Sequence, residues 1–392
     1  MAAPLKGPIE LITNNFRIKS QNHGIIYTYR VDFIDGQAAA LIESSSNPAG
    51  TTVNPDTDQV SNVSRGSLGQ LETFQKYKII NAHTHQLKQI FLQFVFVGSN
   101  LFSTSEFDSQ ITLETTAPFY GRYYTIVIEK CSAFLLDDLN NSKMEDHPIA
   151  LSFINSIIKN SLRNSQLRQI GRNPRFFMPA RAKVFQSQVE TWPGFFTSSW
   201  IFQRGLYLII DNISKFLSVD NCLSLIQDRL QRYDQNFVNR EFEGAIVMAK
   251  YGPHRTYKVH QIKWNMNPKD YIFDHGDEKA RTNMIDYFLT AYQVKINSVN
   301  QPLFEIRQKR QNIYLPPELC TLVGIPAKIR ENKKVMADIR QSLFQKPHER
   351  IASIKELNRM ISDSKEVKEW NLDINLEPDT IEANVLKRPQ IF

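Results

Sequence analysis

The period of the hydrophobic pattern changes along this chain, and that change constrains the fold more than any other feature of the sequence. Residues 9–33 place apolar side chains at alternate positions, which is typical of β-strands. The segment that begins at Pro148 and the segment 283–292 repeat apolar residues every three or four positions, which indicates amphipathic helices. Because strand-rich and helical segments occupy different parts of the chain, the sequence predicts a mixed α+β protein.

The same patterns predict the remaining elements. Strands are predicted at residues 76–82, 88–97, 123–130 and 206–210, and a hairpin at 244–264 with its turn at Gly252 and Pro253. Helices are predicted from Pro148 to Leu162 and at 219–230, 283–292, 326–343 and 349–362, with Pro347 between the last two. Residues 36–70, rich in Ser, Asn, Gly and Thr, are predicted to form a long surface insertion, and 166–200 a connector.

The chain has 392 residues, which is longer than a single hydrophobic core normally supports. Two or three domains are therefore expected. The order of the segments predicts a strand-rich domain at 1–150, a linker at 151–200, a small β-rich domain at 201–320 and a helical extension at 321–392.

Charge and aromatic content narrow the choice of partner. The net charge is +7 and the pI about 9.1, which favours a polyanionic partner, nucleic acid before membrane, although many basic proteins bind no RNA. The chain contains 25 Phe and 14 Tyr, enough aromatic side chains for ordered cores and for rings on which bases could stack.

The cysteines and the apolar runs indicate the compartment. The three cysteines, Cys131, Cys222 and Cys320, are far apart and give neither a disulfide framework nor a CxxC metal knuckle. We expect free thiols in a reducing compartment. The N-terminus lacks a cationic stretch followed by an apolar run, and no apolar run reaches 18 residues. The expected location is the cytosol or the nucleus.

Several segments resemble the Argonaute/Piwi family, and its Piwi branch in particular. Residues 12–18 resemble the opening strand of that family, and 95–104 resemble a hairpin of its N domain. Residues 169–174 and 192–198 resemble the linker that leads into a Piwi PAZ domain. The most specific match is Tyr314-Leu315-Pro316-Pro317-Glu318-Leu319-Cys320, followed by Gly324-Ile325, which resembles the junction between the PAZ domain and the second linker.

The resemblance implies a domain for each part of the chain. It implies an N domain, a linker, a PAZ domain built as a small OB-like β-barrel with a helical clip, and a helical second linker. It covers the N-terminal half of the family, so the MID and PIWI domains are expected to lie outside these 392 residues. Catalysis in this family belongs to carboxylates of the PIWI domain, and we therefore expect no enzyme activity, metal or cofactor here.

The expected function is to bind the 3′ end of a small guide RNA in RNA silencing. Such a pocket needs donors for the last phosphodiester, a ring that stacks on the terminal nucleotide, and a closed end. Segment 250–292 supplies these groups, with Tyr251 beside the predicted turn. Lys250 and Lys258 are further candidates for phosphate contacts.

The resemblance assigns more specific roles within this segment. Arg255, Tyr257, Tyr287 and Tyr292 match residues that contact the terminal phosphate and sugar, Phe273 matches an aromatic that packs on the last nucleotide, and Leu315 matches the apolar wall. In the Piwi branch this pocket accepts a 2′-O-methylated ribose. Ala291 departs from PAZ domains that carry Lys at this position, and Lys250 or Tyr251 stands where other PAZ domains have a histidine.

Several alternatives compete with this interpretation. The tyrosines could be ordinary core residues. The chain could be a truncated Piwi-like protein that binds only protein partners of the silencing complex, or a Dicer-like nuclease, although no RNase III acidic signature is present. His83 and His85 could share a strand face and bind metal, but no third ligand is evident. Two basic groups could contact phosphates or simply be solvated: Arg307, Lys309 and Arg310, and Lys328, Arg330, Lys333 and Lys334.

Overall fold

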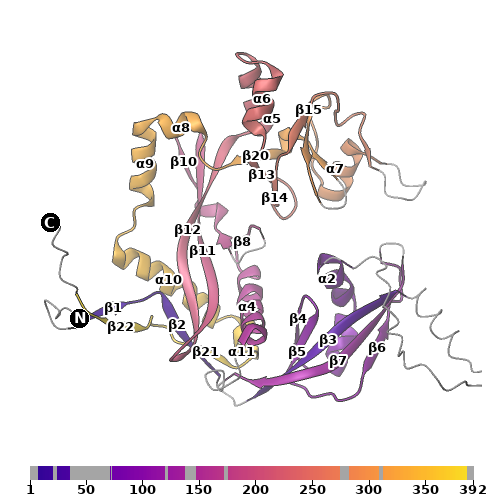
Figure 1. Cartoon of the computed structure of the whole chain (residues 1–392), viewed down its shortest axis with the longest axis vertical. Coiled ribbons are helices and arrows are strands. Elements are labelled where there is room, and N and C mark those ends of the chain that lie inside the picture. The colour runs from indigo at the N-terminus through magenta and orange to yellow at the C-terminus, as the bar shows by residue number, and fades with distance from the viewer. Residues whose placement is uncertain are drawn as a thin grey trace, which may run out of the picture.

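A long antiparallel hairpin forms the centre of the molecule (Figure 1). Its strands are β11 (Val189–Phe202) and β12 (Gly205–Asn221), which pair from Val189↔Ser218 to Phe202↔Gly205. The computed structural model describes residues 8–20, 24–35, 71, 73–119, 122–136, 147–171, 175–273, 282–308 and 312–385. Within them the fold is mixed α+β and strand-rich, which confirms the predicted class.

The hairpin belongs to a ten-stranded sheet whose strands come from residues 15–20, 168–323 and 372–374. Its main path is β14 (Thr256–Lys258), β13 (Ile246–Ala249), β20 (Cys320–Val323), β12, β11, β9 (Arg175–Phe177) and β8 (Arg168–Gln169). The strand β10 (Lys183–Phe185) pairs with β11, β2 (Asn15–Ser20) pairs with β12, and β21 (Leu372–Ile374) pairs with β2. The sheet therefore joins the predicted linkers to both the N-terminal and the PAZ-like regions.

One core lies where the lower part of this sheet meets helices. It combines Phe16 of β2, the apolar face of α4 (His147–Arg163), and side chains of α10 (Pro347–Ser362) and α11 (Lys365–Glu369). Pro148 lies in the first turn of α4 as predicted, and Pro347 is the first residue of α10, where a missing N–H costs no hydrogen bond. The strand β2, expected in the N-terminal domain, packs in this shared core.

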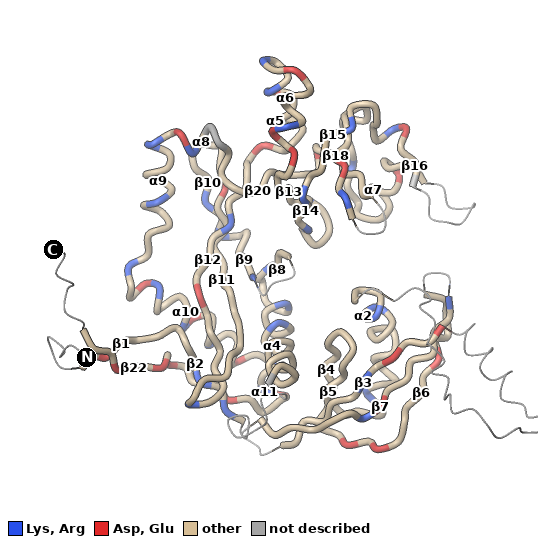
Figure 2. The backbone as a smooth tube through the Cα atoms, in the orientation of Figure 1, with Lys and Arg blue, Asp and Glu red and all other residues tan. Residues whose placement is uncertain are grey.

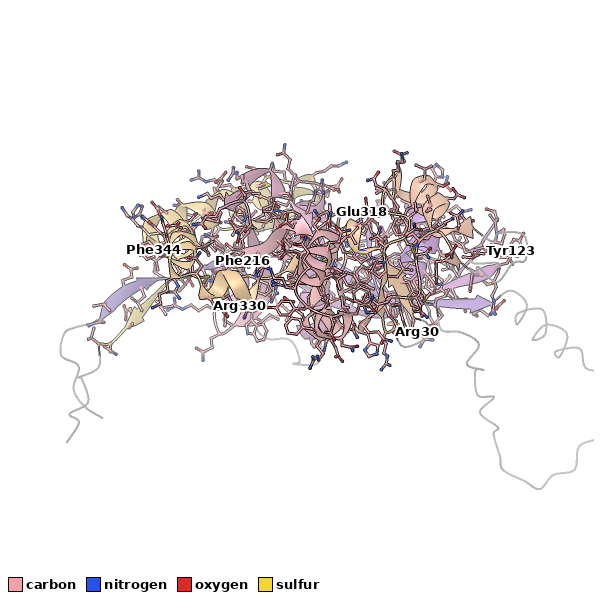
Figure 3. All side chains as sticks on the ribbon, turned by 90° about the horizontal axis from the view of Figure 1, so that it is seen from above. Arg30, Tyr123, Phe216, Glu318, Arg330 and Phe344 are labelled. Atoms are coloured by element: carbon pink, nitrogen blue, oxygen red, sulfur yellow. The ribbon has the colours of Figure 1, made fainter. Side chains whose placement is uncertain are left out.

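A second body is a five-stranded sheet of β4 (Phe94–Val97), β5 (Asn100–Ser103), β3 (Ile25–Asp35), β7 (Tyr124–Leu135) and β6 (Ile111–Glu114). The helices α2 (Thr73–Ala82) and α3 (Thr84–Ile90) contribute Ile79, Ile80 and Leu87 to its core. Seen from above, Tyr123 and Arg30 of this body lie at one end of the molecule, opposite Phe344 (Figure 3).

The prediction of strands at 76–82 and at the start of 88–97 was wrong, because residues 76–82 form most of α2 and residues 88–90 form the end of α3. The stretch contains several Lys and Gln residues, which favour helix, and the adjacent Ile79 and Ile80 are both buried, which a two-sided strand alternation does not predict. His83 and His85 consequently do not lie on a strand. His83 is buried, and its Nδ1 lies 2.8 Å from the Ile79 carbonyl oxygen.

The predicted connector at 166–200 is also largely strand, since it contains β8, β9, β10 and most of β11. Pro193 and Gly194 lie within β11 and do not interrupt it. Gly194 lies within β11 where β9 approaches closely, because a Cβ there would lie 2.2 Å from the Phe176 carbonyl oxygen. The absence of a side chain at Gly194 therefore permits the strand pairing.

The third body is formed by residues that follow the hairpin. It contains α5 (Cys222–Leu230), α6 (Gln235–Phe242), α7 (Met284–Tyr292) and the three-stranded sheet β15 (Gln261–Lys263), β18 (Leu303–Ile306) and β19 (Ile313–Leu315). Two short strands, β16 (Ile272–Phe273) and β17 (Thr282–Asn283), lead into α7. The predicted hairpin at 244–264 is restricted to β13 and β14, because β15 pairs with β18 instead.

The C-terminal helices differ slightly from the predicted boundaries. The helix expected at 326–343 is divided at Asn332 into α8 (Ala327–Glu331) and α9 (Lys333–Leu343), and the Asn332 side chain caps α9. The strand β22 (Thr380–Ala383) was not predicted and pairs with β1 (Ile9–Ile12). The predicted insertion at 36–70 and the pair Lys309-Arg310 lie outside the described residues.

Candidate nucleic-acid interface

A cluster of tyrosines forms where the β13–β14 turn meets α7 (Figure 1). The Asn283 side chain caps this helix by accepting a hydrogen bond from the Asp286 amide at 2.8 Å, and the helix ends at Gln293 in the left-handed region. Tyr287 and Tyr292 both lie on this helix, with ring centroids 5.9 Å apart. Tyr251 of the turn lies 4.8 Å from the Tyr292 ring, so residues distant in sequence share one site.

Backbone conformation allows this contact. Gly252 has a φ of 55°, a left-handed conformation that glycine adopts without strain. A Cβ at this position would lie only 3.1 Å from Cε1 of Tyr292. The turn can therefore approach the tyrosine ring closely because residue 252 has no side chain.

Tyr257 and Arg255 complete the cluster on the hairpin side. Tyr257 is half-buried on β14 opposite Val247, and it packs against the core that contains Tyr251. Arg255 is exposed, and its carbonyl oxygen accepts the Ala249 amide at 2.9 Å. Burial raises the pKa of the Tyr257 hydroxyl, while the charge of Arg255 and its hydrogen bond act in the opposite direction.

Tyr251 and Tyr287 are held in their neutral form. Burial raises the pKa of Tyr251, and burial followed by hydrogen bonding with Tyr292 raises the pKa of Tyr287 to about 12. A neutral hydroxyl both donates and accepts hydrogen bonds. The site thus presents polar groups to a phosphate or a sugar without placing a negative charge beside the phosphate.

The other predicted site residues lie at different depths. Tyr251 and Leu315 are 9% and 3% exposed and form walls of the same core. Lys250 is exposed next to Tyr251, and Ala291 is exposed beside Tyr292. Phe273 lies on β16 opposite Thr282, and its side chain is not among those the structure describes.

Lys258 is separated from the tyrosines. It follows Tyr257 on β14, and successive side chains of a strand point to opposite faces. Its Cε lies 3.7 Å from the position that a Cβ on Gly244 would occupy, at the far end of the hairpin from the turn. Among the cationic residues predicted to contact phosphate, Lys250 and Arg255 are therefore the two that lie near the turn.

Sequence reasoning missed Phe288 as the common neighbour of the cluster. Its ring centroid lies 4.8 Å from that of Tyr251 and 5.7 Å from those of Tyr287 and Tyr292. The available signal was its position four residues before Tyr292, since such pairs meet on one face of a helix. His254, which follows Gly252 and Pro253, was also missed.

Lys and Arg residues occur on several elements, including α4, α9 and α10 (Figure 2). The predicted basic group at 328–334 is divided between α8 and α9, and the Arg330 Nε donates to the Ile325 carbonyl oxygen at 2.9 Å. In the described part of the chain, no three His, Cys, Asp or Glu side chains are grouped to hold a metal ion. No helix in that part is long and apolar enough to cross a membrane.

Comparison with known proteins gives one domain match and several relatives. Residues 219–344 match the PAZ domain. The chain is 27% identical to Piwi-like protein 1 of Gallus gallus over 98% of its length, and 23% identical to Protein piwi of Drosophila melanogaster over 98%. It spans 40% and 41% of those two relatives.

A solved structure shows the same fold. The crystal structure of Drosophila Piwi matches 97% of this chain with a TM-score of 0.59 and 20% sequence identity, and the match covers 44% of that protein. The PAZ match contains the tyrosine cluster, from Tyr251 on the hairpin to Tyr292 on α7.

Proposed function

We propose that this PAZ-containing relative of the Piwi and Argonaute proteins holds the 3′ end of a small, single-stranded guide RNA. The observation that carries the proposal is the convergence of Tyr257, Tyr287 and Tyr292 beside the β13–β14 turn, within the residues that match the PAZ domain. Arg255 and Lys250 supply positive charge at the edge of this cluster. In this proposal the hydroxyls bind the last phosphate and sugar, and the chain acts in RNA silencing.

The chemistry of the cluster indicates what it would recognise. Contacts to phosphate and sugar carry no base code, so affinity should depend on the 3′ end and little on sequence. Only a few cations lie at the site, so affinity should fall gently with salt. The apolar walls at Leu315 and Phe288 suit a 2′-O-methylated ribose, whose methyl group needs no hydrogen bond. Stacking on Phe273 would add roughly 1–3 kcal/mol.

The proposal assigns binding and not catalysis to this chain. We propose four parts: an N-like domain at 1–150, a linker at 151–200, a PAZ domain at 201–320 and a helical second linker at 321–392. The proposed location is the cytoplasm or the nucleus. Other proteins of a silencing complex are its proposed partners. A guide held at one end only should bind weakly, because a second anchor would add avidity.

A titration with labelled single-stranded RNA tests the proposal. The RNA would carry a free, a 2′-O-methylated or a phosphate-blocked 3′ end. The free and methylated ends should bind at least tenfold more tightly than the blocked end, roughly the effect of one or two lost hydrogen bonds. Tyr287→Ala combined with Tyr292→Ala should abolish this difference.

A matched control is available on the same body of the molecule. Tyr233, in the turn between α5 and α6, and Phe237 on α6 form an exposed stacked pair with ring centroids 4.1 Å apart. Tyr233→Ala combined with Phe237→Ala removes a similar aromatic area and should leave end discrimination unchanged. Equal affinity for free and blocked ends, or no loss in the Tyr287 and Tyr292 variant, would instead support a protein that acts without binding RNA.

A further inference from the structure

The turn that carries Gly252 contacts a different part of the chain through His254. His254 has a φ of 51°, a left-handed conformation that is unusual for a residue with a side chain. Its imidazole Nε2 accepts a hydrogen bond from Nη1 of Arg168 on β8, and its Nδ1 lies 3.1 Å from the Ala249 carbonyl oxygen. This contact lies where the β13–β14 turn reaches β8 (Figure 1).

The partners of His254 fix its protonation state. A guanidinium can only donate, so Nε2 must be the unprotonated nitrogen. A carbonyl oxygen can only accept, so Nδ1 must carry the proton and donate to Ala249. Both bonds form together only when the imidazole is neutral.

A buried apolar cluster lies beside this contact. The Trp192 ring of β11 meets the His254 ring edge-on, with centroids 6.2 Å apart. Trp192 also packs with Ile170, Phe177, Leu217 and Met248. Met248 lies on β13 between Val247 and Ala249, which face the opposite core that contains Tyr251. One strand therefore has the β8–β11 interface on one face and the tyrosine cluster on the other.

We propose that Arg168 and Trp192 are positioning residues for the tyrosine pocket and act on it through His254. The proposal rests on the proposed function of that pocket. His254 is two residues beyond Gly252, whose backbone lies against the Tyr292 ring, so release of His254 would free the turn at the point where it meets Tyr292. The pocket would then be ordered only while the turn is held against β8.

The same geometry makes the pocket sensitive to pH. Protonation would turn Nε2 into a donor that faces the donor Arg168, and it would place a second positive charge beside the guanidinium. Burial lowers the pKa of His254 and the charge of Arg168 acts in the same direction, while the hydrogen bond to Ala249 opposes them.

The sign of the pH effect follows from the lowered pKa. The turn is held at pH values above the ordinary histidine pKa of about 6.5, and the contact is lost as the pH falls below it. Arg168 on β8 contacts His254 directly, Arg255 follows it in the sequence, and Glu190 on β11 and Lys215 on β12 both lie beside Trp192, which pairs with Lys215. The Glu190 carboxylate accepts the Trp192 Nε1 hydrogen at 2.7 Å.

The test measures affinity for RNA with a free 3′ end between about pH 5.5 and about pH 8, on either side of the histidine pKa. The full chain should bind less tightly as the pH falls through this range. Arg168→Ala should weaken binding about five- to tenfold at neutral pH, the effect of one charge-assisted hydrogen bond, and flatten the pH profile. Arg168→Lys should recover part of the affinity, because it keeps a donor.

Two further variants separate positioning from folding and from net charge. Asparagine tolerates the left-handed conformation and its amide oxygen can accept from Arg168, so His254→Asn should bind RNA with no pH dependence in this range. Arg175→Ala removes one exposed charge from the neighbouring strand β9 and should leave the profile unchanged.

The outcomes distinguish the two proposals. In one outcome, the variant with Tyr287→Ala and Tyr292→Ala loses binding, while the Arg168 and His254 variants keep the affinity and pH profile of the original chain. This result would reject the positioning role and support the pocket. If the tyrosine variant binds as before, the pocket itself is rejected.

Discussion

Gln301 and Glu318 hydrogen-bond to each other in both directions. The Gln301 Nε2 donates to the Glu318 carboxylate at 3.0 Å, and the Glu318 backbone amide donates to the Gln301 Oε1 at 2.8 Å. The same carboxylate also accepts the backbone amides of Asn297 and Ser298. Glu318 therefore fastens the loop after α7 to the short 3-10 helix at Pro317–Leu319.

Glu318→Ala should destabilise the chain by about 2 kcal/mol, because it leaves several donors without an acceptor. Burial acts to raise the pKa of Glu318, but the hydrogen bonds from Ser298, Asn297 and Gln301 outweigh it and lower the pKa below its ordinary value. This stability is present above about pH 4.3 and is lost as the pH falls through the lower folded-state pKa.

Melting temperatures measured from about pH 3 to about pH 7 check this dependence. Glu318→Gln should melt lower than the original chain near neutral pH, and the difference should shrink in acid. Glu243→Gln, an exposed change on the same body, serves as control. A gap that stays constant down to the lowest pH would contradict the role of the ionised carboxylate.

Gly252→Ala and Gly244→Ala form a matched pair for the turn. Both glycines have a positive φ, so each variant should lose about 1–2 kcal/mol of stability from the left-handed backbone. A Cβ at Gly252 would also lie 3.1 Å from Tyr292, whereas at Gly244 it would meet only the flexible end of Lys258 at 3.7 Å. Titration with RNA should show a loss of about fivefold for Gly252→Ala, roughly one disturbed hydrogen bond, and little change for Gly244→Ala. Equal losses would rule out a local effect on the tyrosines.

Tyr287→Phe should weaken binding of a free 3′ end about three- to tenfold, since it removes one neutral hydroxyl and keeps the ring. Because the pKa of Tyr287 is raised to about 12, the original chain should bind equally well from about pH 8 to about pH 10. A loss of affinity centred on the ordinary tyrosine pKa would show that the pKa of the Tyr287 hydroxyl is not raised. Tyr123→Phe, an exposed change beside the five-stranded sheet, is the control.

Gly194→Ala should destabilise the ten-stranded sheet by about 1–3 kcal/mol, the usual range for an overpacked site. The new Cβ would overlap the Phe176 carbonyl oxygen, so β9 would have to move away from β11. Thermal unfolding compared with Ser198→Ala, on the same strand, measures the effect. Similar melting temperatures for the two variants would mean that β9 can move away from β11 without a loss of stability.

The sequence predicted those elements that have a long hydrophobic pattern or a residue, such as proline, that is typical of an element's end. The helix α4 shows both features, because Pro148 lies in its first turn and its apolar face extends from Ile154 to Leu162. The hydrophobic pattern of residues 76–90, before β4, is shorter. The helix propensity of these residues and the burial of their side chains favoured helix over the predicted strand. Periodicity is ambiguous in such short runs.

The tyrosine pocket shows a second limit of prediction from sequence. The helical spacing of Tyr287 and Tyr292 and the place of Tyr251 beside a turn could be read from the sequence, but the contact between Tyr251 and Tyr292 could not. The Arg168–His254 pair joins residues 86 positions apart, and neither residue belongs to a recognisable motif. Contacts of this kind depend on how two bodies meet, which local patterns do not encode.

The pairing of β1 with β22 has a consequence for synthesis on the ribosome. Ile9 pairs with Ala383, and the Thr13 hydroxyl donates to the carbonyl of Asp379, 366 positions later. At about 5–20 residues per second, the first strand waits roughly 20 to 75 seconds for its partner to be translated. During that time Ile9, Leu11 and Ile12, which are exposed even in the folded chain, have no β22 beside them. The backbone of β1 therefore stays unpaired until translation reaches β22, which leaves this strand open to pairing with other strands during synthesis.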